Sequence, residues 1–584
     1  MLHVFLASVL PLCVASRVAA MTVNETVITA STGSIAMTQA NGFDPLGVWY
    51  AGVQALKQKG PCPAAVEAAK SKNIGIVGAG MSGLMTYLVL HEAGFTNLTI
   101  LEASDRLGGR VQTAYLTGGP SDYSYQEMGA MRFPVNYLDK NGTSHNIAET
   151  ELVFSLIDEM NKRNKGDPSL RIDLIPFLDY NDNGLQYFHG IRTENGLPPT
   201  IRQISENSSL TVSVILDPAT EAVKKQLADS LPDESFTITM TKNMYEAHRK
   251  WNDSGLGGLP GDRWTNFAYI SQHLNGSLNS TDQLDGMQDP GENFWKLVYN
   301  SMFHGARDYK TVDGGLNRIP QSFAPLVSDS IQMGVKVERV QYANGKVTLQ
   351  WKPSFRDKDF RDSTFDYAII SVPFSVVRQW RMPDIDMTMA NGIQNLNYED
   401  VCKVALEYSE RFWEKFENPI VGGCSTETDI PGISLVCYPS YNLNSTGPAS
   451  ILASYLRSNP RRELARMSTM SDEEHAMYAL DAMTEIHGEE TRALYTGKFA
   501  RKCWGRDPLA VGSWANPSVG QHELYMPEYF KVHKNLIFVG EHTSVTHSWI
   551  ASAVASGIRG AVQMLLELGL VDEAKAAVEK WLVN

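Results

Sequence analysis

The stretch Gly78-Ala79-Gly80-Met81-Ser82-Gly83 lies between an apolar run at residues 73–77 and a run with helical periodicity at 84–93. A glycine-rich turn that leads from a buried strand into a helix is typical of a dinucleotide site. The first glycine permits the tight turn, the second lets a pyrophosphate approach the backbone, and the third lets helix and strand pack closely. The positive end of the helix attracts the phosphates. The stretch therefore predicts a Rossmann-like, dinucleotide-binding fold.

A second apolar run at residues 98–101 ends at Glu102, which follows Gly83 by 19 residues. At the end of the second strand, a carboxylate can accept hydrogen bonds from both ribose hydroxyls of an adenosine. The same carboxylate would repel a phosphorylated ribose, so NADP is disfavoured. Glycine triplets also mark ordinary turns, but two strands, a helix and an acidic residue in this order favour a cofactor loop.

The chain has 584 residues, of which 43% are hydrophobic and 20% charged, and this predicts a globular protein of two or three domains. Its net charge of -14 argues against a nucleic acid partner. No apolar stretch beyond the N-terminal region is long enough to span a bilayer, so we expect no membrane association.

Residues 1–20 look like a secretory signal peptide, with an apolar run at 4–14 and the small-residue cleavage pattern Val18-Ala19-Ala20. The alternative is a buried N-terminal helix. Secretion is supported by eight Asn-x-Ser/Thr sequons, at Asn24, Asn97, Asn141, Asn207, Asn252, Asn275, Asn279 and Asn444. We therefore expect a secreted, extracellular glycoprotein.

The cysteines suit a secreted protein but do not define a metal site. Once Cys13 leaves with the signal peptide, five remain, so at least one thiol is free. A disulfide involving Cys424 and Cys437 is one pairing that the sequence leaves open. No Cys-x-x-Cys pair or histidine cluster has ligand spacing, so no metal is predicted.

The order of the predicted elements indicates an α/β protein with a discontinuous Rossmann-like domain. Strand patterns recur at 335–340, 347–351, 365–372 and 535–541, with Asn344-Gly345 as a hairpin turn and a helix at 550–568. Charged, turn-rich residues precede them, and β-like runs at 401–408, 435–438 and 451–455 lie between them. The predicted domains are an N-terminal extension (21–72), a cofactor-binding domain (73–138, 301–375 and 499–584), an inserted helical domain (139–300) and a mixed-sheet substrate domain (376–498).

Beside the first loop, Gly108-Gly109-Arg110 offers two glycines and a guanidinium within reach of the pyrophosphate. At this point the chain resembles the flavin amine oxidase family, and the resemblance extends from about residue 73 to 568. Further motifs occur in the family's order: Gly129-Ala130-Met131-Arg132-Phe133-Pro134, Asp313-Gly314-Gly315, Lys403, and Gly540-Glu541 followed by Trp549. The Gly-Ala-Met-Arg-Phe-Pro segment is most similar to that of the L-amino-acid oxidases.

The resemblance implies that FAD is the cofactor and assigns a role to each matching residue. Arg132 would hold the substrate carboxylate, because a planar guanidinium matches two carboxylate oxygens, and Tyr438 would share that carboxylate. Lys403 would reach flavin N5 through a water, and Trp549 and Trp514 would wall a site for apolar or aromatic substrates. The implied cofactor-binding residues are Gly78, Gly80, Met81, Ser82, Gly83, Glu102, Ala103, Arg110, Gly129, Ala130, Met131, Arg132, Val340, Gly540, Glu541, Trp549 and Ile550.

Alternatives exist for several of these residues. Tyr438 is equally typical of a core tyrosine, Val340 of a core valine, and Lys403 could point into solvent from an alternating strand. The family's covalently flavinylated members use a cysteine before the last strand, where residues 511–515 read Val-Gly-Ser-Trp-Ala, so noncovalent FAD is predicted. A catalytic base in the helical insert cannot be placed.

The function implied is oxidative deamination of L-amino acids to 2-oxo acids, with release of ammonia and H2O2. The expected partners are an L-amino acid and O2, and a homodimer is left open. An amine or polyamine oxidase is the nearest alternative, since it shares the FAD motifs but needs no carboxylate clamp. A noncatalytic binding protein with an FAD fold is a third.

Overall fold

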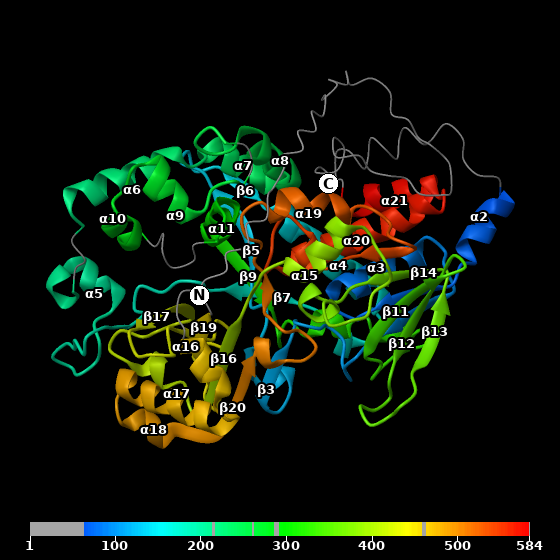
Figure 1. Ribbon diagram of the computed structural model, residues 1–584. Helices are drawn as coiled ribbons and strands as arrows, with labels where there is room; N and C mark the ends of the chain where they lie inside the picture. Colours follow the sequence, from blue (N-terminus) through cyan, green and yellow to red (C-terminus); the bar gives the residue numbers. More distant parts are fainter. Residues whose placement is uncertain (1–62, 213–215, 260–261, 285–290, 458–462, 583–584) are drawn as a thin grey trace, which may run out of the picture.

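The computed structural model describes residues 63–212, 216–259, 262–284, 291–457 and 463–582. The predicted signal peptide, most of the N-terminal extension, Asn24, Cys13 and Cys62 lie outside these residues. Figure 1 shows a parallel sheet with its helices on one side of the molecule, a second large sheet below left, and a group of helices above it. No helix of the described residues is long and apolar enough to cross a membrane.

The parallel sheet has five strands in the order β10-β2-β1-β14-β22. Every neighbouring pair is parallel. All four residues of β1 are buried, as expected for a strand covered on both faces. The strands are β1 (Ile74–Val77), β2 (Leu98–Leu101), β10 (Ile331–Gln332), β14 (Tyr367–Ile370) and β22 (Leu536–Phe538). Segments far apart in the chain thus build one sheet, which confirms the α/β, Rossmann-like class.

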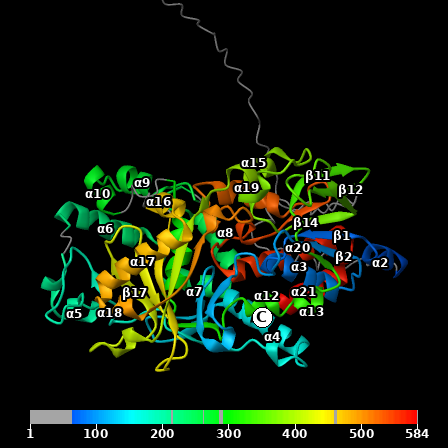
Figure 2. The ribbon, with the colours of Figure 1, turned by 90° about the horizontal axis from the view of Figure 1, so that it is seen from below.

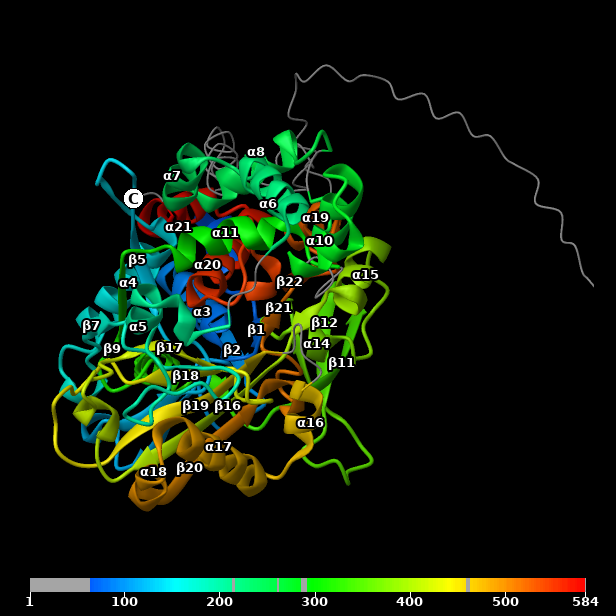
Figure 3. The ribbon, with the colours of Figure 1, turned by 90° about the vertical axis from the view of Figure 1, so that its left-hand side faces the viewer.

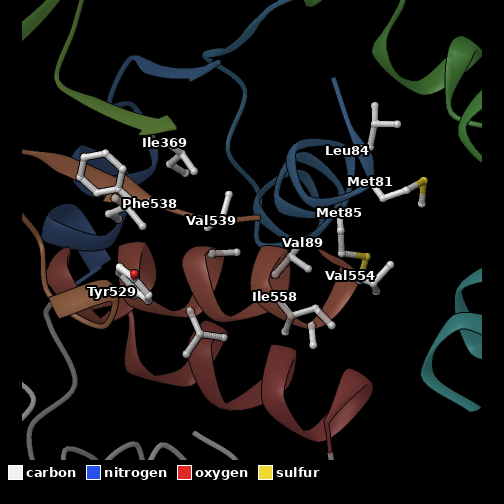
Figure 4. Packing of buried hydrophobic residues seen from close by; sticks show 14 of the residues in the cluster. Met81, Leu84, Met85, Val89, Ile369, Tyr529, Phe538, Val539, Val554 and Ile558 are labelled. Atoms are coloured by element: carbon white, nitrogen blue, oxygen red, sulfur yellow. The ribbon is translucent and has the colours of Figure 1, made fainter. Parts of the chain in front are cut away.

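Two helices from opposite ends of the chain pack together against this sheet. They are α3 (Met81–Glu92) and α20 (Ile550–Glu567), and Figure 4 shows Met85 and Val89 of α3 beside Val554 and Ile558 of α20. A Cβ placed on Gly557 would lie 2.4 Å from the carbonyl oxygen of Ser82, so only glycine permits this approach. The small residues at the start of α20 therefore serve close helix packing. α4 (Ala148–Arg163) and α21 (Val571–Trp581) contact α20 as well.

A three-stranded antiparallel sheet adjoins the parallel one, formed by β11 (Val337–Ala343), β12 (Lys346–Trp351) and β13 (Arg361–Phe365). The predicted hairpin turn is correct: Asn344 and Gly345 both have positive φ, 54° and 73°. The continuous strand predicted at 365–372 is wrong, because Phe365 ends β13 in this sheet and Tyr367 begins β14 in the other. Asp366 between them accepts the backbone N–H of Asn73 at 2.9 Å.

The second large sheet has six strands in the order β20-β16-β19-β18-β17-β8. The strands are β8 (Gln186–Tyr187), β16 (Val401–Tyr408), β17 (Gly423–Thr428), β18 (Leu435–Tyr438), β19 (Ala449–Arg457) and β20 (Tyr495–Cys503). Figures 2 and 3 show α16 (Glu463–Thr469), α17 (Asp472–His487) and α18 (Glu490–Leu494) along one face. Disulfides join Cys402 to Cys503 and Cys424 to Cys437. The predicted boundary at 498/499 falls inside β20, whose pairing with β16 extends to Cys503.

The insert predicted as helical contains strands in its first third. β7 (Leu174–Phe177) joins β5 (Phe133–Leu138), β6 (Ser144–Asn146) and β9 (Asp308–Val312) in a four-stranded sheet. The insert begins with β6 and α4, and between residues 201 and 304 the described regular elements are all helical. The α-helices among them are α5 (Ile201–Glu206), α6 (Pro218–Ser230), α7 (Glu234–Lys242), α8 (Met244–Ser254), α9 (Asn266–Ala268), α10 (Leu278–Gln283) and α11 (Phe294–His304).

Short elements connect these units. They include α2 (Pro63–Lys70), β3 (Thr113–Thr117), β4 (Ser124–Glu127), α12 (Arg318–Gln321), α13 (Ala324–Val327), α14 (Phe374–Val377), α15 (Met387–Asn395), β15 (Tyr398–Glu399), β21 (Trp514–Ala515) and α19 (Gln521–Tyr529). Two of them, β15 and β21, pair beside the cavity described next.

Candidate functional site

A cavity of about 690 Å³ lies where the parallel sheet, the six-stranded sheet and the helical insert meet. Its wall begins at the glycine loop after β1 and passes Arg110 and the 128–132 segment. It ends among residues of the six-stranded sheet and of α11. Most of the predicted site residues therefore lie around one space.

The glycine loop has the geometry that the sequence predicts. Gly78 has a φ of 100°, which only glycine adopts readily, and a Cβ on Gly83 would fall 2.0 Å from the carbonyl oxygen of Gly78. Gly80 differs, because a Cβ built there would meet no heavy atom within 4 Å. Gly80 is the N-cap residue of α3 and, as a glycine, has no side chain that could bind the first N–H groups of the helix. With Met81 and Ser82 it lines the cavity, so an open helix N-terminus faces the space, as a pyrophosphate requires.

Glu102 lies at the rim of the cavity with Ala103. Its Oε2 accepts the backbone N–H of Ala79 at 2.6 Å, and its Oε1 accepts the N–H and hydroxyl of Ser104 at 2.8 and 2.7 Å. These contacts fix the carboxylate and use both acceptor sites of Oε1, which leaves one site on Oε2. A ribose hydroxyl can be bound there.

The expected role of Val340 is not supported by its position. Val340 is not among the described residues that line the cavity, and its backbone N–H donates to the carbonyl oxygen of Arg381 at 2.8 Å. Val335 and Val337, three to five residues earlier, line the cavity instead. The segment has valines at all three positions, so the pattern alone could not select the right one.

Arg110 and Glu541 meet across the cavity wall. Nη1 of Arg110 donates to Oε1 of Glu541 and to the carbonyl oxygen of Ser513, each at 3.0 Å. Burial alone would raise the pKa of Glu541, but Arg110 and His547 lower it to about 2. Glu541 is therefore an anion that can accept further hydroxyl hydrogen bonds. Gly540 lines the cavity beside it.

Lys403 lies in the wall opposite, on the fully buried strand β16. Its Nζ donates to the carbonyl oxygens of Gly129 at 2.7 Å and Glu127 at 3.1 Å. Burial, together with Arg132 and Arg457, lowers the pKa of Lys403 to about 7 although Glu127 opposes this shift. Lys403 thus points into the protein and its charge is readily lost. It also fixes the Gly129 segment, which lines the cavity with Ala130 and Met131.

Arg132 lines the cavity, as predicted, but it is already paired. Its Nε lies 2.6 Å from Oδ1 of Asp179, and its guanidinium lies 5.6 Å from the ring of Phe177 and 5.7 Å from that of Tyr309. The aromatic rings and the carboxylate hold the guanidinium in place. The contact with Asp179 is an ion pair without hydrogen-bond geometry, and it involves only Nε of the guanidinium.

Tyr438 lies away from the cavity, which corrects its predicted role. Its hydroxyl shares hydrogen bonds with Thr426 Oγ1 at 3.1 Å and His487 Nε2 at 2.6 Å, within the core between the six-stranded sheet and α17. The disulfide-bonded Cys437, next along β18, faces Met131 instead. Among the described residues, two other tyrosines line the cavity: Tyr299 of α11, and Tyr455 of β19, whose ring lies 4.6 Å from Lys403 Nζ. Successive residues of a strand point to opposite faces of the sheet. The sequence did not show which face of β18 is turned toward the cavity, so it could not show that Tyr438 points away from it.

Trp514, Trp549 and Ile550 line the cavity, as expected. The ring of Trp549 packs 4.9 Å from Phe303 and 6.1 Å from His304 of α11. His304 also lines the cavity, and burial, with Arg132 and Arg457, lowers its pKa to about 4. No motif marks His304 in the sequence. The helical insert thus brings a neutral imidazole to the site.

Comparisons with known proteins agree with this arrangement. A family model described as flavin containing amine oxidoreductase matches residues 81–565. An L-amino-acid oxidase of Neurospora crassa is 51% identical over 561 residues, which cover 94% of this chain and 80% of that protein. An L-amino-acid oxidase of Siganus canaliculatus is 27% identical and covers 86% of this chain and 87% of its own. A solved structure of a putrescine oxidase double mutant has a TM-score of 0.57 at 17% identity, covering 85% of this chain and 99% of that chain.

Proposed function

Because the chain belongs to the flavin-containing amine oxidoreductase family, we propose that it is an L-amino-acid oxidase that binds FAD noncovalently. The net reaction converts an L-amino acid, O2 and water into a 2-oxo acid, ammonia and H2O2. One observation carries the choice of amino acids over simple amines. The Arg132 guanidinium lies in the wall of the same cavity as Lys403 and Trp549, which suits a substrate that carries a carboxylate.

The residues around the cavity fit FAD. The bare Gly80 and the uncapped start of α3 suit the pyrophosphate, Glu102 suits the adenosine ribose, and Glu541 suits hydroxyls of the ribityl chain. Residues 511–515 contain no cysteine to attach a flavin covalently. Bound FAD would supply the acceptor for the substrate hydride and be returned to its oxidised form by O2.

The protein's own contribution begins with the substrate carboxylate. Arg132 would bind it through the N–H groups that Asp179 leaves open, and the Tyr455 hydroxyl would share it in place of Tyr438. The indole of Trp549 would limit how far the side chain of the substrate can move. Orientation of the substrate's Cα–H bond accounts for much of the rate in such reactions.

The amine must be neutral before it can lose a hydride. His304 lies at the cavity wall with its pKa lowered to about 4, so it stays neutral and is too weak a base to hold a proton taken from the substrate ammonium. Lys403, with its pKa lowered to about 7, can hold or release a proton beside the Gly129 carbonyl. Above neutral pH both His304 and Lys403 are uncharged, so neither places a positive charge near the amine.

The test compares matched substrates on the purified, yellow protein. Under anaerobic conditions an L-amino acid such as L-phenylalanine should bleach the flavin absorbance, whereas its decarboxylated amine should not. Admission of air should restore the colour and release H2O2. Bleaching by the amine but not by the amino acid would instead identify an amine oxidase, and no bleaching by either would favour a noncatalytic protein.

Secretion is a separate part of this proposal. It is supported by the apolar N-terminal run, the sequons, and disulfides at Cys402–Cys503 and Cys424–Cys437, which persist in oxidising compartments. A full-length chain should appear in the medium with a mass reduced by glycosidase treatment, and one lacking residues 1–20 should stay inside the cell. A homodimer is also proposed, and light scattering of the purified protein tests it.

A further inference from the structure

A chain of buried polar side chains connects the helical insert to the flavin side of the cavity. Nε2 of His522 lies 3.0 Å from Nε2 of His547, and Nδ1 of His547 lies 2.9 Å from the carbonyl oxygen of Glu541. At the other end, Nδ1 of His522 lies 3.4 Å from Oδ2 of Asp262. Asp262, His522 and His547 are only 1%, 3% and 1% exposed. No step of the proposed reaction uses these three residues.

The protons of this chain follow from the partners. A carbonyl oxygen only accepts, so His547 Nδ1 donates to Glu541, and the Nε2 atom of a neutral His547 is then an acceptor. His522 must therefore donate through its own Nε2. Its Nδ1 lies 3.4 Å from Oδ2 of Asp262, within ion-pair distance but without a hydrogen bond. A protonated His522 would therefore stand opposite the Asp262 carboxylate as the second member of a buried ion pair.

Asp262 interacts electrostatically with Arg263, whose guanidinium is bound to Glu523 at 2.5 Å. Oδ2 of Asp262 accepts a hydrogen bond from Asn293 Nδ2 at 3.2 Å, and the ring of His248 packs edge-on to His522 at 5.2 Å. Burial, together with His522 and His547, lowers the pKa of His248 well below its usual value, so His248 stays neutral. A carboxylate as buried as Asp262 is costly unless a partner balances its charge, and His522 Nδ1 is a titratable group 3.4 Å away.

The chain ends on the segment 541–549, which forms the flavin side of the cavity. Glu541, His542, Ser548 and Trp549 of this segment line the cavity. Further contacts from the helical insert hold the same segment. Trp295 Nε1 donates to the carbonyl oxygen of Val545 at 2.8 Å, and the Tyr245 hydroxyl lies 3.1 Å from Ser544 Oγ.

We propose that Asp262, His522 and His547 are positioning residues that hold the 541–549 segment in its flavin-binding conformation, with His522 bound to His547 on one side and paired with the Asp262 carboxylate on the other. The proposal concerns retention of the cofactor and not the substrate. It therefore stands or falls separately from the amino-acid assignment. Its consequence is that charge balance at Asp262, and not only the bulk of His522, governs how tightly FAD binds.

The test is a charge rescue, read as the FAD dissociation constant of the refolded apoprotein by quenching of flavin fluorescence. His522→Gln leaves the Asp262 carboxylate buried and unpaired, and should weaken FAD binding by about 30-fold or more. The Asp262→Asn/His522→Gln double variant removes that charge with almost no change in shape. It should recover about 10-fold or more of the loss, which a role of His522 in packing alone does not predict.

His533→Gln is the matched control, because His533 is also buried and its Nε2 lies 2.9 Å from the carbonyl oxygen of Glu528, a residue of the same helix as His522. Its FAD affinity should equal that of the wild type. Wild-type affinity in His522→Gln, absence of recovery in the double variant, or an equal loss in His533→Gln would each overturn the proposal. If His522→Gln does not fold, recovery of a folded, FAD-binding double variant supports the proposal and its failure to fold overturns it.

Discussion

Alanine at Gly80 and alanine at Gly83 should have opposite consequences, although the two glycines belong to one motif. Gly80 has φ −71° and ψ 174°, values that alanine adopts without strain, and its Cβ would meet no heavy atom within 4 Å. Gly80→Ala should therefore fold with unchanged or slightly higher stability, by about 0.4–1 kcal/mol, because alanine restricts the unfolded chain. The added methyl would, however, occupy the space that the pyrophosphate needs. We expect FAD affinity to fall by about 150-fold or more, the loss of two charge-assisted hydrogen bonds of about 1.5 kcal/mol or more each.

Gly83→Ala places a Cβ 2.0 Å from the carbonyl oxygen of Gly78, far inside van der Waals contact. The start of α3 must move away from β1, which should destabilise the protein by about 3 kcal/mol or more. Chemical denaturation of each apoprotein measures its stability, and titration with FAD measures cofactor affinity, so the two effects are measured separately. Wild-type FAD affinity in Gly80→Ala would refute the placement of the pyrophosphate over Gly80, and wild-type stability in Gly83→Ala would refute the close packing.

Three further outcomes are expected. Tyr455→Phe should raise KM for L-amino acids about 10-fold, because one hydrogen bond to the carboxylate is lost. Tyr438→Phe should leave the kinetics unchanged and lower the free energy of unfolding by about 1–3 kcal/mol. If Tyr438 held the substrate, steady-state kinetics and urea unfolding would show the reverse. Arg132→Ala should lower kcat/KM for amino acids by about 10- to 150-fold while flavin absorbance is retained, and unchanged kinetics would remove it from the carboxylate site. Lys403→Met should keep FAD bound yet slow flavin reduction or reoxidation in stopped flow. Because the pKa of Lys403 is lowered to about 7, it is cationic below that pH and neutral above it, so the wild-type rate should rise with pH through about 7, and the same rise in Lys403→Met would assign it to another group.

The cofactor half of the site was predictable from the sequence because its requirements are local. A positive φ at Gly78, the open Cβ position at Gly80 and a carboxylate one strand later are set by spacing along the chain. The hairpin at Asn344-Gly345 was predictable for the same reason. Such features need no knowledge of how distant segments pack.

The substrate half depends on contacts between segments far apart in the chain, which spacing does not reveal. Choosing Tyr455 over Tyr438 requires knowing which face of each strand meets the 128–131 segment. The Asp179 partner of Arg132 comes from the insert, where motifs are weakest, and His304 comes from a helix without a motif. The Val340 prediction failed within a correctly located segment, because a shift of three residues along a valine-rich strand leaves the pattern unchanged.

The order of the five parallel strands has a consequence for how the chain is made. β1 is synthesised early, but the edge strand β22 and the helix α20 that packs on α3 come from the last tenth of the sequence. At about 5–20 residues per second, roughly 25 to 90 s separate the synthesis of the central strand β1 from that of the edge strand β22. During that interval α3 can pack on β1 and β2, but the side that contacts α20 stays uncovered. The wall of the cavity that Gly540 and Glu541 form is likewise made last, so the cofactor site is completed only when synthesis is nearly over.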